Sequence, residues 1–282
     1  MARHRIKLCR EYVCGLALLA AMLVAACAPA VPHPAGRPAQ PTIVSLNPCL
    51  DAILVEIAPP DQVLALSHYS RDPSGSSIPA SVAARYGVTG GTAEEVIAQA
   101  PDVVIASIFL PQPTRHALER AGLKVVTFGS PRTVAESAAQ VRQVAVLAGR
   151  KAEGEALAAR VAAPASPRTF IEALLWQPGE IVAGEQTLIA ELMWQEGFTS
   201  HAAARGLGQA DAVTLEQILA VPPRLLLIAG DAAGQRHPVL DGDLKSTHIA
   251  PFDPALIYCG GPTIPKARAR LRAIRAQVEA PS

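Results

Sequence analysis

Two stretches of the chain repeat one pattern, and this repeat constrains the fold more than any other feature. Residues 92–105 read TAEEVIAQAPDVVI, and residues 214–227 read TLEQILAVPPRLLL. The offset is 214 − 92 = 122 at every position, so the two stretches align without a gap. A unit that recurs in this way predicts two similar lobes rather than one enlarged core.

Each copy predicts a helix that leads into a buried strand. Thr92 with Glu95, and Thr214 with Gln217, have the spacing of a capping box, in which both side chains accept backbone hydrogens at the helix start. A proline then ends each helix, because the residue before proline disfavours the α conformation. The apolar run that follows is typical of a strand buried on both faces of a parallel sheet. The prolines are Pro101 and Pro223, and the strands are expected at Val103–Ile105 and Leu225–Leu227.

The rest of the chain alternates between apolar strands and amphipathic helices, which predicts an α/β fold. Asn47 and Pro48 are typical of a helix start, with asparagine as the N-cap and proline in the first turn. Residues 133–163 have a helical composition that is broken at Gly149. Further strands are expected at 42–46, 63–66, 124–128, 169–175 and 255–258, and the basic run 266–275 is expected to be a solvated helix face.

The N-terminus carries basic residues and then the apolar stretch 13–26, which is too short for a stable transmembrane helix and predicts an export signal. Its end, LVAAC, resembles a bacterial lipobox, in which Cys27 would be lipidated and become the new N-terminus. The alternative is an ordinary signal cleaved after Ala26 or Ala30. Four prolines between residues 28 and 40 then predict a stiff tether.

Composition excludes several functions. The chain has 25 basic and 24 acidic residues, so no strong field is available to hold nucleic acid or an anionic membrane. No nucleophile elbow, P-loop or zincin motif is present, and the histidines are dispersed, so we expect no catalytic residue, no cofactor and no metal site. Beyond the signal and Cys27, Cys49 and Cys259 could form a disulfide in an oxidising compartment, but they belong to different lobes, and two free buried thiols are expected.

In open α/β sheets, ligands bind beyond the carboxyl ends of the strands, and this rule selects the candidate site residues. Aromatic residues are only 4% of the chain, yet several follow strand ends, which favours an apolar cleft for a large, flat ligand. Tyr69 and Trp176 are expected to line this cleft from opposite lobes. The candidates are Asn47, Pro48, Cys49, Asp51, His68, Tyr69, Arg71, Asp72, Phe109, Trp176, Gln177, Glu185 and Cys259, and Tyr258 is a further aromatic residue near a strand end.

An exported chain with IVSLN at 43–47, GGTAEEVIAQAPDVV at 90–104 and TLEQIL at 214–219 resembles the periplasmic substrate-binding proteins of vitamin B12 and ferric-siderophore ABC importers. The resemblance spans nearly all of 42–278. It implies two Rossmann-like lobes with the ligand in a cleft between them, a long connecting helix and no catalysis. The expected boundaries are 1–26 for the signal, 27–41 for the tether, 42–132 and 165–282 for the lobes, and 133–164 for the connection.

The resemblance also implies the partners. The chain is expected to act as a monomer that delivers a metal-chelate nutrient to a permease in the inner membrane, with Glu94 and Glu216 docking into arginine pockets on the permease. Members bind corrinoids, ferric chelates or haem. Arg71 is the one clear cationic cleft candidate, which favours a neutral, corrinoid-like ligand over anionic siderophores. The alternatives are an exported α/β hydrolase and a protein that captures a bare transition metal.

Overall fold

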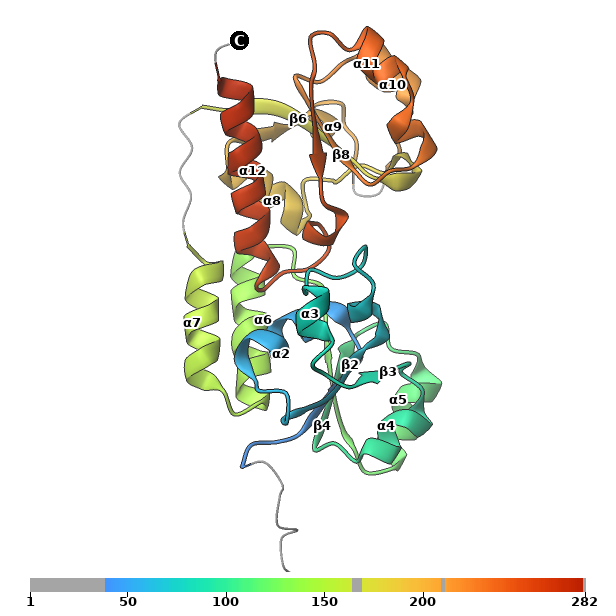
Figure 1. Ribbon diagram of the computed structural model, residues 1–282, viewed down its shortest axis with the longest axis vertical. Helices are drawn as coiled ribbons and strands as arrows, with labels where there is room; N and C mark the ends of the chain where they lie inside the picture. Colours follow the sequence, from blue (N-terminus) through green and yellow to red (C-terminus); the bar gives the residue numbers. More distant parts are fainter. Residues whose placement is uncertain (1–38, 164–168, 209–210, 281–282) are drawn as a thin grey trace, which may run out of the picture. The chain divides into compact units, whose positions relative to one another are not determined.

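The computed structural model describes residues 39–163, 169–208 and 211–280 (Figure 1). Residues from Gln40 onward group as one compact unit. The predicted export signal and Cys27 lie outside the described residues. No helix in the described ranges is both long and apolar enough to cross a membrane.

The first lobe is built on a five-stranded parallel sheet with the order β3-β2-β1-β4-β5. Ile43 of the central strand lies opposite Val63 on one side and Val103 on the other. All five carboxyl ends therefore meet at one edge of the sheet. The strands are β1 Ile43–Ser45, β2 Val63–Ser67, β3 Val88–Thr89, β4 Val103–Ser107 and β5 Lys124–Phe128.

The second lobe is built on a four-stranded parallel sheet with the order β7-β6-β8-β9. This order repeats that of the first sheet without its edge strand β3, because β6, β7, β8 and β9 take the places of β1, β2, β4 and β5. The offset of 122 carries β4 onto β8, so the two lobes that the repeat predicts are confirmed. The strands are β6 Ile171–Trp176, β7 Phe198–Ser200, β8 Leu225–Ala229 and β9 His248–Phe252.

Helices cover both faces of each sheet, and alternate residues of a strand enter different cores. Ile43 and Ile105 pack into a large cluster shared with α2, α6, α7, α8 and α12, whereas Val44 and Val104 face α4 and α5. The helices are α2 Pro48–Ile57, α3 Ala80–Ala83, α4 Ala93–Gln99, α5 Gln112–Arg120, α6 Val134–Leu147, α7 Lys151–Val161, α8 Leu188–Gln195, α9 His201–Ala204, α10 Leu215–Ala220, α11 Val239–Asp243 and α12 Thr263–Glu279. Short 3-10 turns are η2 His68–Arg71, η3 Pro178–Glu180, η4 Ala233–Arg236 and η5 Pro254–Leu256.

The connection between the lobes contains two helices, α6 and α7, which lie side by side (Figure 1). The predicted break at Gly149 is confirmed, and Gly149 has the left-handed φ of +67° that such a turn needs. The helices approach so closely that a Cβ on Gly154 would lie 2.2 Å from the Cβ of Ala145. A hairpin therefore stands where the resemblance implies one continuous helix.

The two predicted capping boxes differ. At α10 the box is complete, because Thr214 Oγ1 accepts from the Gln217 amide and Gln217 Oε1 accepts from the Thr214 amide. At α4, Thr92 accepts from the Glu95 amide, but the Glu95 carboxylate accepts instead from the Thr89 hydroxyl and the Gly90 amide. These two bonds lower the pKa of Glu95. The first box is therefore half formed.

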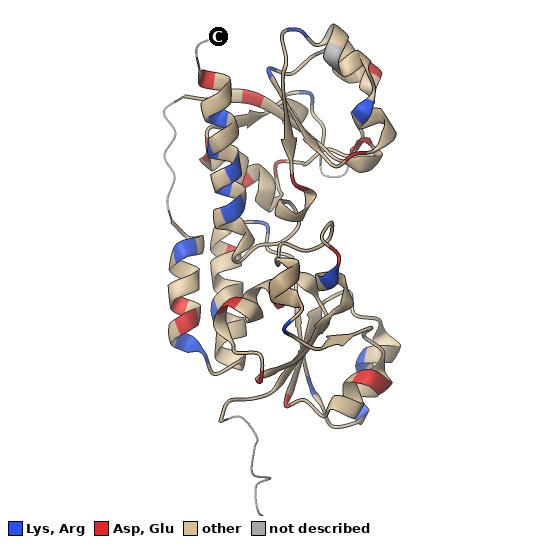
Figure 2. Ribbon diagram, in the orientation of Figure 1, with Lys and Arg blue, Asp and Glu red and all other residues tan. Residues whose placement is uncertain are grey.

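Two expectations for the C-terminal region are wrong. The last strand is β9, and residues 255–258 begin in the 3-10 turn η5, because Asp253 Oδ1 accepts from the Ala255 amide and so caps that turn. The basic face of α12 (Figure 2) is not all solvated. Arg268 is buried and donates to the Val161 carbonyl, and Arg272 pairs with the buried carboxylate of Glu196 at 2.9 Å.

Candidate functional site

The first strand end places Asn47, Pro48 and Cys49 at the start of α2. Asn47 Oδ1 accepts from the amides of Cys49, at 2.9 Å, and Leu50, at 3.2 Å. Pro48 occupies the first helical position, as predicted. The side-chain oxygen of Asn47 is thus occupied by the helix cap, which leaves Asn47 and Cys49 as half-buried wall residues of a small pocket.

Asp51 is fully buried beneath the loop that follows β2. Its Oδ2 accepts from the Ser67 amide at 2.9 Å and from the Ser70 hydroxyl at 2.6 Å. Burial raises the pKa of Asp51 to about 8, and hydrogen bonds from Ser45, Ser70 and Ser67 oppose the rise. Asp51 therefore supports the loop from inside, and its predicted place on the cleft surface is wrong.

The loop above Asp51 presents aromatic groups to solvent. Tyr69 is 57% exposed, and the exposed His68 ring lies against it with centroids 4.0 Å apart. Arg71 is exposed but donates to the Tyr86 carbonyl at 2.9 Å, within the same lobe. The Asp72 carboxylate accepts from the amide and hydroxyl of Ser74, which lowers the pKa of Asp72.

Two further aromatics are exposed near strand ends. Phe109, just after β4, is 78% exposed, and its neighbour Ile108 is also exposed. Tyr258, between η5 and α12, is 57% exposed. Tyr69, Phe109 and Tyr258 therefore expose aromatic rings on three separate segments.

Trp176 does not line a cleft. It is 1% exposed, its indole N–H donates to the Val213 carbonyl at 2.8 Å, and it packs in the core on one face of the second sheet. Gln177 beside it is also buried. The expectation of a cleft tryptophan at this position is wrong, because the chain folds back after β6 and pairs Val182 with Trp176.

One pocket beside β6, β7 and α8 has a volume of about 560 Å³. Its wall combines the segment after β5 with β6, β7, α8 and the loop between β6 and α8, so it draws on both lobes and on the start of α6. The lining residues are Arg132, Thr133, Glu136, Ala173, Leu174, Leu175, Ala183, Glu185, Gln186, Ala190, Glu191, Met193, Trp194, Phe198, Ser200 and Ala202. Of these, the sequence singled out Glu185.

Four charged residues line this pocket: Arg132, Glu136, Glu185 and Glu191, with a formal sum of 1 − 3 = −2. Glu136 accepts from the Arg132 amide at 2.7 Å, and Glu191 accepts from the Val134 amide at 2.8 Å, which ties α8 to the start of α6. Trp194 is 60% exposed. The sequence did not single out Trp194, because the carboxyl-end rule selects residues that follow strands, and Trp194 lies near the C-terminal end of α8.

A second pocket, of about 20 Å³, lies where the first lobe meets Tyr258. Asn47, Cys49, Ser107 and residues 128–131 form its wall. Cys49 and Cys259 form a disulfide here, with Cα atoms 5.0 Å apart, so the expectation of two free thiols is wrong. No group of three or more potential metal ligands occurs among the described residues.

Glu94 and Glu216 occupy matching positions in the first turns of α4 and α10, and both are exposed. Neither belongs to an ion pair within the described residues. The pKa of Glu216 is lowered by its own backbone N–H and by the Thr214 hydroxyl. Each lobe therefore presents an exposed carboxylate at the start of the repeated helix.

Comparisons with known proteins agree with this architecture. A family model described as periplasmic binding protein matches residues 43–250. A search of curated proteins finds no match. Among solved structures, the periplasmic heme binding protein HutB of Vibrio cholerae has a TM-score of 0.67 at 17% identity, covering 83% of this chain and 98% of its own.

Two other solved structures give similar values. The periplasmic vitamin B12 binding protein BtuF of Vibrio cholerae has a TM-score of 0.62 at 16% identity, covering 86% of this chain and 99% of its own. The periplasmic heme-binding protein BhuT, in complex with two hemes, has a TM-score of 0.65 at 17% identity, with coverages of 85% and 99%. At such identities the similarity shows the shared fold.

Proposed function

Because the chain belongs to the periplasmic binding protein family, we propose that it is the substrate-binding component of an ABC importer and captures a metal-chelate nutrient. The family implies a periplasmic location and a permease partner. Its members are transport proteins, and we assign no catalytic residue to this chain.

The pocket of about 560 Å³ is the main support for the proposed class of ligand. Its volume falls within the range of about 300–1,000 Å³ that is typical of small-molecule sites. Trp194, Met193 and Phe198 provide apolar surface. Such surfaces suit a large, flat chelate, and HutB, BtuF and BhuT are each described as binding heme or vitamin B12.

Charge distinguishes among the chelates. A pocket with a formal charge of −2 repels strongly anionic ferric catecholates and accepts neutral or cationic ligands. Arg71, the cation considered from sequence, is held by the Tyr86 carbonyl. A corrinoid is therefore the proposed ligand.

Haem is the second candidate, because one pair of side chains favours it. His68 and Tyr69 are both exposed and stack on each other at the end of β2. Imidazole and phenolate groups are both known axial ligands of haem iron. If haem is the ligand, replacement of His68 and Tyr69 should abolish binding. If a corrinoid is the ligand, binding should remain.

The chain offers an intrinsic probe for the test. Its two tryptophans differ sharply, since Trp176 is buried in the core and Trp194 lines the pocket. The mature domain is titrated with cyanocobalamin, haemin, ferric siderophores and zinc while tryptophan fluorescence and melting temperature are recorded. A ligand at a hundred times its dissociation constant adds about 2.7 kcal/mol, or roughly 5–10 °C for a domain of this size.

We expect cyanocobalamin to quench Trp194 and to raise the melting temperature. The variant Trp194→Phe should lose most of the quenching and keep the thermal shift. A double variant, His68→Ala with Tyr69→Phe, should keep cyanocobalamin binding and would lose binding if haem were the ligand. A thermal shift with zinc and none with any chelate would contradict the proposal.

We also propose that Glu94 and Glu216 dock the two lobes onto the permease. Support comes from their exposure, their lack of ion-pair partners among the described residues and their recurrence at matching positions. Charge pairs across an interface fix register and speed association. The double variant Glu94→Arg, Glu216→Arg should keep its melting temperature and ligand affinity but lose permease-stimulated ATP hydrolysis.

A control with the same change in charge, Asp61→Arg with Glu279→Arg, should retain that stimulation. Full uptake by the Glu94/Glu216 double variant in reconstituted vesicles would contradict the proposal that these residues dock onto the permease.

Lipidation of Cys27 is proposed as the membrane anchor. Cell fractionation provides the test, because Cys27→Ser should move the protein from the membrane fraction to the soluble periplasmic fraction. An unchanged distribution would favour the ordinary signal peptide.

A further inference from the structure

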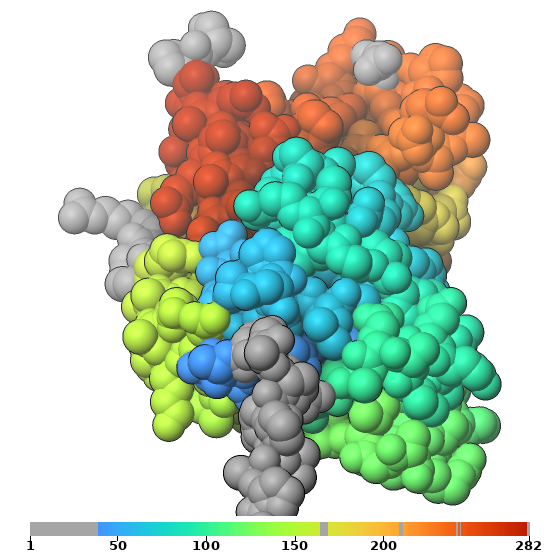
Figure 3. Space-filling model, turned by 60° about the horizontal axis from the view of Figure 1, so that its bottom comes forward, coloured from blue at the N-terminus to red at the C-terminus, as the bar shows by residue number. Residues whose placement is uncertain are grey.

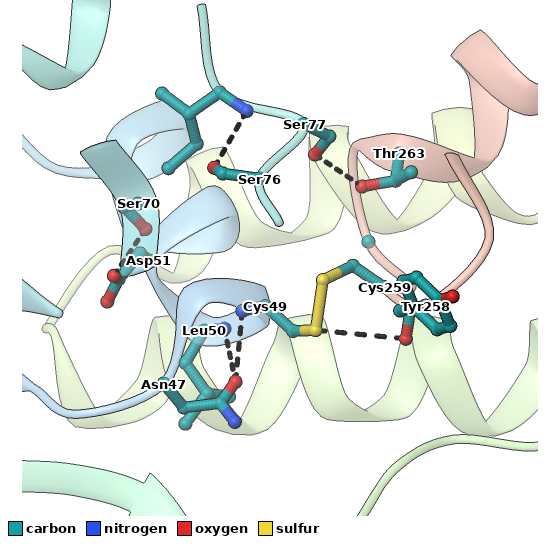
Figure 4. The surroundings of a disulfide bond; sticks show 12 residues. Asn47, Cys49, Leu50, Asp51, Ser70, Ser76, Ser77, Tyr258, Cys259 and Thr263 are labelled. Atoms are coloured by element: carbon teal, nitrogen blue, oxygen red, sulfur yellow. Dashed lines mark hydrogen bonds between the residues drawn. A yellow bond between two sulfur atoms is a disulfide. The ribbon is translucent and has the colours of Figure 1, made fainter. Parts of the chain in front are cut away.

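The segment that carries Tyr258 is fastened to the first lobe by the disulfide between Cys49 and Cys259. Cys49 lies in the first turn of α2, and Cys259 lies between η5 and α12, 210 residues later in the chain. Figure 4 shows the bond with Asn47 on one side and Tyr258 on the other. The bond therefore joins two segments that both face the small pocket.

The residues after Cys259 fit tightly against helices of the first lobe and the connection. The Gly261 amide donates to Ser137 Oγ of α6 at 2.7 Å. A Cβ on Gly260 would lie 2.3 Å from the same oxygen, and a Cβ on Gly261, whose φ is +58°, would lie 2.8 Å from Ile53 Cγ1 of α2. At Gly260 and Gly261 there is room for the backbone alone, so the packing closely defines the path of this segment.

The start of α12 adds two polar contacts to the first lobe. Ser77 Oγ lies 2.7 Å from Thr263 Oγ1, and Lys266 Nζ donates to the Ser77 carbonyl at 2.8 Å. In the space-filling view, the red C-terminal surface lies directly against the cyan surface of the first lobe (Figure 3). These contacts are exposed or half-buried. Among the described residues, the disulfide is the one covalent bond between side chains across this junction.

Tyr258 depends on this junction for its position. Tyr258 is 57% exposed, yet it lines the small pocket with Ser107 and Phe128, which end β4 and β5. Its carbonyl oxygen lies 3.8 Å from Cys49 Sγ. Because a disulfide sulfur carries no hydrogen, this is a van der Waals contact while the disulfide is intact.

We propose that the Cys49–Cys259 disulfide is a positioning device for ligand binding, which holds Tyr258 at the carboxyl edge of the first sheet so that only the oxidised protein binds its ligand at full affinity. The ligand part of this inference rests on the proposed function. A preorganised ring loses less conformational freedom when the ligand binds, at about 0.5–1.5 kcal/mol per side chain. The periplasm, where the family operates, is oxidising enough to maintain such a bond.

The main test compares the wild-type protein with the double variant Cys49→Ser, Cys259→Ser. Hydrogen exchange of residues 254–263, without ligand, reports on the position of the segment and needs no ligand to be known. Affinity for cyanocobalamin is measured from Trp194 quenching. Ser77→Ala is the matched control, because it removes a contact between the first lobe and the start of α12 and leaves the disulfide intact.

Reduction of the wild-type protein gives a second route to the open state. Both thiols of dithiothreitol become its cyclic disulfide, while Cys49 and Cys259 each gain one electron and one proton. The reduced protein should behave like the double-serine variant, and reoxidation should restore the starting values.

We expect exchange in 254–263 to rise about tenfold or more and affinity to fall about two- to twelvefold in the double-serine variant, the fold-change that corresponds to the free-energy range above. Ser77→Ala should change neither value by more than about twofold. Unchanged exchange in 254–263 overturns the positioning role whether or not the protein binds cyanocobalamin. If the wild-type protein binds no chelate, the proposed function fails and exchange alone decides this inference.

Unchanged affinity in a variant with raised exchange overturns the link to ligand binding. If the double-serine variant does not fold, Tyr258→Ala in the disulfide-bonded protein must show the same loss of affinity, and full affinity in that variant overturns the proposal.

Discussion

The substitution Trp176→Phe tests whether Trp176 is a core residue, as the structure shows, or a ligand contact, as the sequence predicted. The side chain is 1% exposed and packs with Leu174 and Leu226 in the second lobe. Its N–H donates to the carbonyl of Val213, a residue that is itself fully buried. Phenylalanine keeps most of the apolar contact but cannot donate this hydrogen bond.

The expected loss of stability has two parts. A buried carbonyl left without a partner costs about 1–3 kcal/mol. The smaller ring leaves a cavity that adds about 1 kcal/mol on the scale of core truncations. We therefore expect the free energy of unfolding to fall by about 2–4 kcal/mol, while affinity for the ligand changes by less than about twofold.

Urea unfolding followed by circular dichroism measures the first quantity, and the thermal shift with saturating ligand reports the second. The matched variant is Trp194→Phe, because Trp194 is 60% exposed and lines the pocket. Its free energy of unfolding should change by less than about 0.5 kcal/mol, as for other surface substitutions. A Trp176→Phe protein with full stability and lost affinity would refute this reasoning and place Trp176 in the binding site.

Three further predictions concern the fold. The native state holds the Asp51 proton up to about pH 8, whereas the unfolded chain releases it near pH 4. The contribution of Asp51 to the free energy of unfolding therefore falls as pH rises through this window, by up to about 1.4 kcal/mol per pH unit. Asp51→Asn should remove that slope in urea unfolding at several pH values, and an unchanged slope would contradict the assignment. Thr214→Ala removes the N-cap of the complete capping box and should lower the free energy of unfolding by about 0.5–2 kcal/mol in the same assay; no loss would show that the cap is dispensable. Gly154→Val adds a Cβ that would lie 2.2 Å from the Cβ of Ala145, so thermal denaturation should show a loss of about 1–3 kcal/mol, and an unaltered melting temperature would contradict the close packing of α6 against α7.

The sequence by itself determined those features that depend on short-range patterns. The repeat predicted two similar lobes, and both copies contain a helix followed by a buried strand, α4–β4 and α10–β8. The break at Gly149 and the cap at Asn47 were also predictable, because helix ends are encoded within a few neighbouring residues. The carboxyl-end rule found the exposed rings of Tyr69 and Phe109, since strand ends in a parallel sheet share one edge.

Only the tertiary structure decided which distant groups meet. Cys49 and Cys259 are 210 residues apart, and no local pattern states that their Cα atoms lie 5.0 Å from each other. Arg268 belongs to the basic run that the sequence predicts to be solvated, yet it is buried where α12 meets α7. Trp176 is buried although the sequence predicted it in the cleft, and Trp194, which the sequence did not single out, is exposed, because a side chain's surroundings come from the packing of other elements. Burial and pairing depend on contacts between segments far apart in the chain, which the residues on either side do not specify.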